Sequence, residues 1–100
     1  MSVIMMLRVK ADPDALERYA SENGEQLQRI TEDAKSKGAV HHLFAAGDGE
    51  VVVIDEWDSA ESFQGFFEGQ SEIPAIMQAA GAEGAPEISF FRKLSTGDEF

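Results

Sequence analysis

Two adjacent histidines, His41 and His42, are the side chains of this sequence best suited to proton transfer. An imidazole exchanges a proton near neutral pH, so either residue could act as a general base. Both lie in a predicted strand, where neighbouring side chains point to opposite faces, and they therefore cannot bind one metal ion together. We expect one of them to enter a pocket; the structural alternative is one buried and one exposed histidine. Apolar residues occur on both faces of this strand, so alternation leaves the pocket face open.

Trp57, the single tryptophan, ends a second apolar strand and shares a face of it with Asp55. An indole at a pocket rim can stack on an aromatic ligand and donate its N–H to a ligand oxygen. A carboxylate held within an apolar sheet could shuttle protons. The structural alternatives are that Trp57 closes the core at the strand end, and that Asp55 lies near an edge or pairs with Arg8 or Arg92.

Aromatic and amide side chains supply further candidates for ligand contact. Three phenylalanines after Trp57 follow helical spacing and lie on one stripe, as core or as pocket lining. Tyr19 and Asn23 share another helical stripe and could hydrogen-bond a ligand if that stripe forms a pocket wall; a core position for Tyr19 is the alternative. The candidate catalytic residues are His42, His41 and Trp57, and the candidate substrate-binding residues are Tyr19, Asn23, Asp55, Phe63, Phe66 and Phe67.

Composition limits the classes of partner. The chain has 100 residues, 43% of them hydrophobic, and a formal net charge of −11, which disfavours nucleic acid and anionic membrane surfaces. It has no cysteine and no histidine spacing typical of a metal site, so we expect no metal. The apolar start, residues 1–7, lacks a basic region and is too short to span a bilayer. We expect it to be a strand of a cytoplasmic protein.

The pattern of apolar residues and turn formers predicts the elements that position these candidates. Strands are expected over 3–10, 39–46, 51–57 and 87–93, and helices over 13–37 with an interruption at Asn23-Gly24, from about Ser59 to 69, and over 74–80. Asp12 before Pro13 is a typical N-cap. Asp58, three residues before Glu61, is the expected cap of the next helix, with Ser59 as the alternative. Residues 82–86 are expected to be a linker.

The order of elements, β-α-β-β-α-β, predicts an α+β fold, the ferredoxin-like plait, with a four-stranded antiparallel sheet and helices on one face. Right-handed crossovers give the strand order 4-1-3-2. We expect a single domain over 1–100, in which the short acidic tail 95–100 frays or lies on a partner chain. The first strand is apolar on both faces, yet helices cover only one. We therefore expect a homodimer formed through the open sheet face.

The segment Glu56-Trp57-x-Ser59-x-Glu61-x-Phe63, within this order of elements, resembles the antibiotic biosynthesis monooxygenase-like family of the dimeric α/β-barrel superfamily. The resemblance implies homodimers whose sheets close into a barrel, with a pocket in each subunit between sheet and helices. It also implies activities such as cofactor-free oxygenation of aromatic polyketides and quinols, or haem degradation.

One departure from the family pattern narrows these activities. Haem-degrading members have a histidine on the second helix, whereas residues 63–68 contain none, so haem degradation is disfavoured. The resemblance then implies a cofactor-independent monooxygenase, or a related enzyme, that acts on a small aromatic or quinol-like molecule. The alternative is a non-catalytic dimer of the same fold that binds a small apolar ligand or has a structural role.

Overall fold

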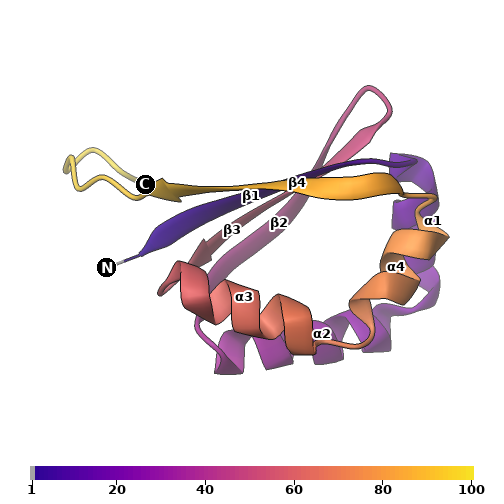
Figure 1. Cartoon of the computed structure of the whole chain (residues 1–100), viewed down its shortest axis with the longest axis horizontal. Coiled ribbons are helices and arrows are strands. Elements are labelled where there is room, and N and C mark those ends of the chain that lie inside the picture. The colour runs from indigo at the N-terminus through magenta and orange to yellow at the C-terminus, as the bar shows by residue number, and fades with distance from the viewer. Residues whose placement is uncertain (1) are drawn as a thin grey trace.

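The computed structural model describes residues 2–100 and has the predicted order of strands and helices, with the first helix divided in two. The elements are β1 (Val3–Lys10), α1 (Pro13–Glu22), α2 (Gly24–Ser36), β2 (Ala39–Gly47), β3 (Glu50–Trp57), α3 (Ala60–Gly69), α4 (Ile73–Ala79) and β4 (Glu83–Arg92). All strand pairs are antiparallel and the sheet order is β2-β3-β1-β4, the predicted order read from the other edge. The helices lie below the sheet and at one end of it (Figure 1). The α+β, ferredoxin-like architecture is therefore confirmed.

Local sequence sets the ends of the first two helices. The carboxylate of Asp12 accepts hydrogen bonds from the backbone N–H groups of Asp14 and Ala15, at 3.0 and 3.3 Å, and Pro13 begins α1. This is the predicted N-cap, which satisfies donors that have no partner inside the helix. The predicted interruption also occurs, because Asn23 separates α1 from α2. Among the described residues, no helix is long and apolar enough to cross a membrane.

The cap of α3 is Ser59, not Asp58 as first expected. The Ser59 hydroxyl accepts from the backbone N–H of Ser62 at 3.1 Å. The Asp58 carboxylate instead lies against Gly38, where a Cβ atom would come within 2.5 Å of Asp58 Oδ1. Gly38 also has a φ of +117°, a conformation that side chains rarely adopt. Glycine thus lets the α2–β2 turn sit close to the end of β3, beside Trp57.

The expectation of a linker over 82–86 is wrong for most of that segment, because β4 begins at Glu83 and contains Pro86. Proline lacks the N–H that a central strand needs, but β4 is at the edge of the sheet, where its loss is tolerated. Gly84 has a φ of +74°, and the pairing of β1 with β4 shifts register between Arg8 and Lys10. This irregularity lets β4 extend past its proline.

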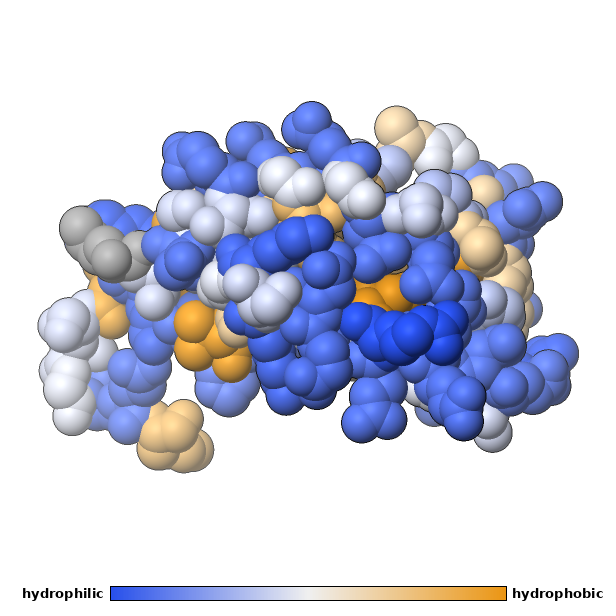
Figure 2. Space-filling model, turned by 90° about the horizontal axis from the view of Figure 1, so that it is seen from below, coloured by the Kyte–Doolittle hydropathy of each residue, from blue (hydrophilic) through white to orange (hydrophobic). Residues whose placement is uncertain are grey.

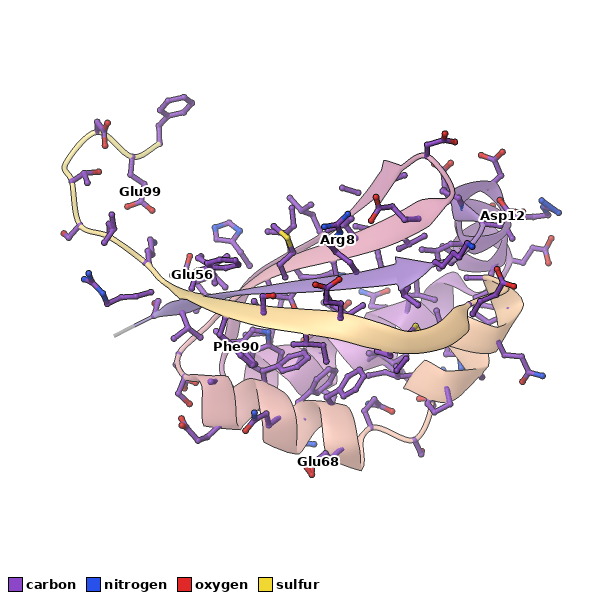
Figure 3. The ribbon with its side chains drawn as sticks, turned by 45° about the horizontal axis from the view of Figure 1, so that its top comes forward. Arg8, Asp12, Glu56, Glu68, Phe90 and Glu99 are labelled. Atoms are coloured by element: carbon purple, nitrogen blue, oxygen red, sulfur yellow. The ribbon has the colours of Figure 1, made fainter. Side chains whose placement is uncertain are left out.

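The hydrophobic core lies between the sheet and the helices. Alternate residues of β1 and β3 point into it, together with the aromatic stripe of α3. The buried members include Met5, Leu7, Val9, Leu16, Val51, Trp57, Phe63 and Phe66. The side chain of Phe90 on β4 points toward α3 and packs against Phe63, with ring centroids 5.8 Å apart (Figure 3). The helices and the aromatic side chains therefore bury this face of β1 and most of this face of β3.

The opposite face of the sheet, called the outer face here, is apolar at its centre and covered by no helix. Strand register and alternation place on it Ile4, Met6, Leu43, Val52, Ile54 and Phe91. Leu43 and Phe91 are each 52% exposed. The helix side differs, since its surface is mostly hydrophilic with small apolar areas between side chains (Figure 2).

Two ion pairs flank the apolar centre of the outer face. Arg8 pairs with Glu50 at 2.9 Å toward one end, and Lys93 pairs with Glu56 at 3.2 Å toward the other (Figure 3). Glu56 is only 8% exposed. The pKa of its carboxyl lies below the ordinary value because the Ser2 hydroxyl and, next, the Lys93 ammonium stabilise the charged form. The tail beyond β4 returns toward this pair, since Glu99 contacts Lys93 at 2.7 Å.

A candidate active site between the sheet and the helices

A cavity of about 170 Å³ lies between the inner face of the sheet and helices α2, α3 and α4. One water molecule needs roughly 10–15 Å³ in this measure, so the cavity has room for a small organic molecule. Its lining is mostly apolar and comes from β1, β2, β3 and the three helices. The lining side chains with polar atoms are Thr31, Lys35, His41, His42, Asp55 and Trp57.

Three of these polar side chains form one hydrogen-bonded group on the sheet wall. Asp55 is 6% exposed, and each of its carboxylate oxygens has one partner. Oδ1 lies 2.7 Å from Nδ1 of His42, and Oδ2 accepts from the indole N–H of Trp57 at 3.0 Å. Trp57 is 1% exposed, whereas the His42 side chain is 40% exposed. A buried carboxylate thus joins a buried indole to an accessible imidazole.

This arrangement fixes which nitrogen of His42 can act as a base. An ionised carboxylate only accepts hydrogen bonds, so the neutral imidazole carries its proton on Nδ1, facing Asp55. Nε2 then holds the lone pair, on the side of the ring away from Asp55. His42 lines the cavity, and a neutral imidazole of this tautomer has Nε2 available as a general base. The ring also packs edge-to-face on Phe44, with centroids 4.9 Å apart.

The β2–β3 hairpin creates the group. Gly47 pairs with Glu50 across a two-residue turn, Asp48-Gly49, in which Gly49 has a φ of +71°, a conformation that glycine adopts without steric cost. Counting back from this turn in both strands brings His42 opposite Asp55. Residues directly opposite share a face of the sheet, and Trp57, two positions beyond Asp55, shares it too. The register of one hairpin therefore assembles the whole group.

His41 lies opposite Glu56 and so belongs to the outer face, although it also borders the cavity. The strand is irregular between Ala39 and His41, at the mouth of the hairpin. Within residues 2–100, no cluster of three or more His, Cys, Asp or Glu side chains could hold a metal ion. The two histidines thus have different surroundings, and only His42 has a carboxylate partner on the inner face.

The remaining candidates divide into two groups. The three α3 rings, Phe63, Phe66 and Phe67, line the cavity, and the first of these stacks on the third with centroids 5.4 Å apart. Tyr19 and Asn23 do not line the cavity. The Tyr19 hydroxyl donates to Gln26, and the Asn23 amide donates to the backbone carbonyl of Tyr19 at 2.9 Å. Their expected place on the pocket wall is corrected, because they join α1 to the start of α2.

Solved structures with this fold include several oxygenases. SnoaB, a cofactor-independent oxygenase from Streptomyces nogalater, matches with a TM-score of 0.61 and 19% identity over 98% of each chain. A monooxygenase from the gene ActVA-Orf6 of Streptomyces coelicolor, in complex with the ligand Nanaomycin D, matches with a TM-score of 0.66 and 16% identity. The match covers 95% of this chain and 89% of that one. A dimeric ferredoxin-like protein from an uncultured marine organism matches with a TM-score of 0.66 and 13% identity, over 99% of this chain and 93% of that one.

These likenesses confirm the expected resemblance in fold to antibiotic biosynthesis monooxygenases. The identities are too low to carry more than the fold. No family model and no curated protein sequence matches the chain.

Sequence reasoning missed the polar residues of the α2 wall. Thr31 and Lys35 line the cavity, together with Leu27, Ile30 and Ala34 of the same helix. The apolar stripe of α2 is visible in the sequence, and residues four apart lie on one face of a helix. Following that spacing from Leu27 to Thr31 and Lys35 would have identified both.

Proposed function

We propose that this protein is a cofactor-independent oxygenase that acts on a small hydroxylated aromatic molecule in the cavity. The single observation that carries the proposal is the His42–Asp55 pair on the wall of an otherwise apolar cavity. A ligand-binding protein would have no need of a base aligned by a buried carboxylate. The shared fold with SnoaB and with the ActVA-Orf6 monooxygenase supports the same kind of activity.

The chemistry needs a base and an apolar site. His42 Nε2 takes an acidic proton from the substrate, and the resulting carbanion or phenolate gives one electron to O₂. The two radicals combine through a new C–O bond to form a peroxide, which receives the proton back from His42. Loss of water then leaves a carbonyl, so a CH₂ group and O₂ become C=O and H₂O. The apolar walls keep bulk water from the anion and the peroxide.

Each member of the hydrogen-bonded group has a distinct part in this proposal. His42 is the base. Asp55 orients the imidazole and stabilises the imidazolium that forms when it accepts the proton. Trp57 is a positioning residue, because its N–H holds the second carboxylate oxygen of Asp55. The rings of α3 provide apolar surface for an aromatic substrate.

Oxygen uptake tests the proposal directly. We expect the purified protein to consume O₂ with anthrone or a naphthoquinol faster than buffer does, and ¹⁸O₂ to place one labelled atom in the carbonyl formed from the CH₂ group of anthrone. His42→Ala should lower the rate by about 100-fold or more, because general-base catalysis typically contributes 10²–10⁴-fold.

His41→Ala is the matched control, since it removes the neighbouring imidazole, which lies opposite Glu56, and should retain the rate. Uptake no faster than buffer across the panel would favour the non-catalytic binding protein instead. A His42→Ala variant as fast as the unchanged protein would refute the role of this residue.

We further propose that the protein is a homodimer in which two outer faces pack together. The outer face presents an apolar centre framed by ion pairs, and exposed apolar surface of this kind is rarely left to water. The dimeric ferredoxin-like protein of the same fold supports this arrangement. Sheet-on-sheet packing would bury the outer-face residues of both copies.

Sedimentation should therefore give twice the chain mass of 10.9 kDa at micromolar concentration. Leu43→Asp puts a charge on the outer face at a position that is already half exposed in one chain, and it should yield monomers with an unchanged circular dichroism spectrum. Gln28→Asp adds the same charge on exposed α2 and should remain dimeric. A monomeric unchanged protein would rule out this assembly.

A further inference from the structure

The cavity has polar groups on two opposing walls, and the oxygenase chemistry uses only one of them. His42, Asp55 and Trp57 belong to the sheet wall, whereas Thr31 and Lys35 belong to α2. The two α2 residues are four positions apart and lie one turn from each other on the same helix face. Two residues that carry a hydroxyl and an ammonium group therefore line the same side of the cavity.

The charge balance of the lining is unlike that of the whole chain. The chain carries a net charge of −11, yet among residues 2–100 Lys35 is the only lysine or arginine that lines the cavity and Asp55 is the only carboxylate. Both oxygens of Asp55 already have partners. The one full charge that the cavity leaves without a close partner is therefore positive.

Lys35 is held more loosely than the other ion-paired basic side chains. Its ammonium lies 3.8 Å from Glu32, and both side chains are about two-thirds exposed. The other lysine and arginine ion pairs of the described residues measure 2.7–3.2 Å. An exposed pair at this separation contributes little, so the Lys35 ammonium can turn to a ligand at small cost.

We propose that the cavity takes an aromatic carboxylate, whose acid group is bound by Lys35 with the Thr31 hydroxyl at the α2 wall. This deepens the proposed function, on which it rests, by naming the substrate class of the same site. One ammonium and one hydroxyl suit a monoanion, and charge-assisted hydrogen bonds to a carboxylate are strong. The apolar remainder of the cavity suits the aromatic body.

Binding the acid group at α2 would also orient the substrate. The sheet wall with His42 faces the α2 wall across the cavity, so an aromatic ring anchored at Lys35 presents its far side to the base. A hydroxyl or CH₂ group on that side would then meet Nε2 of His42. Fixing a substrate in this way favours proton transfer because little further ordering is needed.

Calorimetric titration with 2-naphthoate and 2-naphthamide tests the inference without any reaction. The two probes have nearly the same shape and differ in charge. The unchanged protein should bind the naphthoate about tenfold more tightly than the naphthamide. Lys35→Met should abolish or reverse this preference, since the remaining charge of the protein repels an anion. Thr31→Val should weaken naphthoate binding, because it removes the hydroxyl that donates to the acid group.

Lys37→Met is the matched control. Lys37 lies at the same helix end but pairs with Asp33 at 3.0 Å and does not line the cavity. Both lysines place a positive charge near the end of α2, so Lys37→Met controls for the loss of that charge alone. It should keep the preference for 2-naphthoate over 2-naphthamide. Equal affinities for the two probes, no binding of either, or a preference that survives Lys35→Met would overturn the carboxylate site.

The same titrations separate this inference from the oxygenase proposal. Oxygen uptake with a neutral quinol, together with equal affinities for the two probes, would contradict the carboxylate site alone. A clear preference for the naphthoate without oxygen uptake from any substrate would contradict the oxygenase proposal alone. In that case the cavity would be a binding site for aromatic acids.

Discussion

Replacing Asp55 by asparagine should lower the rate of oxygen uptake about 10²–10⁴-fold while the fold is retained. The asparagine amide has nearly the shape of the carboxylate, but only one of its two polar atoms accepts hydrogen bonds. With its oxygen toward the Trp57 indole, its NH₂ group would donate to Nδ1 of His42. The imidazole would then carry its proton on Nε2, with no lone pair for the substrate.

Ring ¹⁵N NMR of His42 distinguishes this explanation from a loss of structure. In the unchanged protein the neutral ring should be protonated on Nδ1, and in Asp55→Asn on Nε2. Asp48→Asn makes the same substitution in the exposed β2–β3 turn, where Asn-Gly is also a favoured pair, and should change neither rate nor tautomer. Full activity in Asp55→Asn, or a neutral His42 protonated on Nε2 in the unchanged protein, would contradict the proposed role of Asp55.

Much of the fold follows from short-range signals in the sequence. Asp12-Pro13 predicts a helix start, Asn23-Gly24 a helix interruption and Gly47-Asp48-Gly49 a hairpin turn, and the structure has all three. The start of β4 was not predictable in this way. Pro86 argues against a strand unless the strand lies at an edge, and that is known only once the whole sheet is assembled.

The candidate site was predicted residue by residue but not as a group. His42, Asp55 and Trp57 were each identified, yet the only side-chain partners considered for Asp55, as the structural alternative, were Arg8 and Arg92. Arg8 pairs with Glu50 instead. Counting from the two-residue turn could have identified His42 as the partner of Asp55. The inner face of β2 could not be predicted, because both faces of this strand carry apolar residues. Contacts that depend on helix placement, such as those of Tyr19, lie beyond local reasoning.

Trp57→Ala should reduce the free energy of unfolding by about 3–5 kcal/mol, a large part of the roughly 5–15 kcal/mol typical of a domain this size. The indole is 1% exposed and packs on Phe63 and Phe66, with ring centroids 5.6 and 5.3 Å away. Its removal leaves a cavity among these rings and takes a donor from buried Asp55. Urea unfolding followed by circular dichroism measures the loss, since the variant lacks the only tryptophan fluorophore.

Trp57→Phe separates the two roles that the sequence left open for this residue. It retains most of the packing but not the N–H, so its stability loss should be about 1–3 kcal/mol, the cost of an unpaired buried polar group. If Trp57 positions Asp55, oxygen uptake should fall even under conditions in which the variant is fully folded.

Protein concentration must be equal throughout the unfolding experiments, because dimers gain stability with concentration. Leu94→Ala, at a position 57% exposed, should change stability by less than about 0.5 kcal/mol. A loss below about 1 kcal/mol in Trp57→Ala would show that the indole does not close the core.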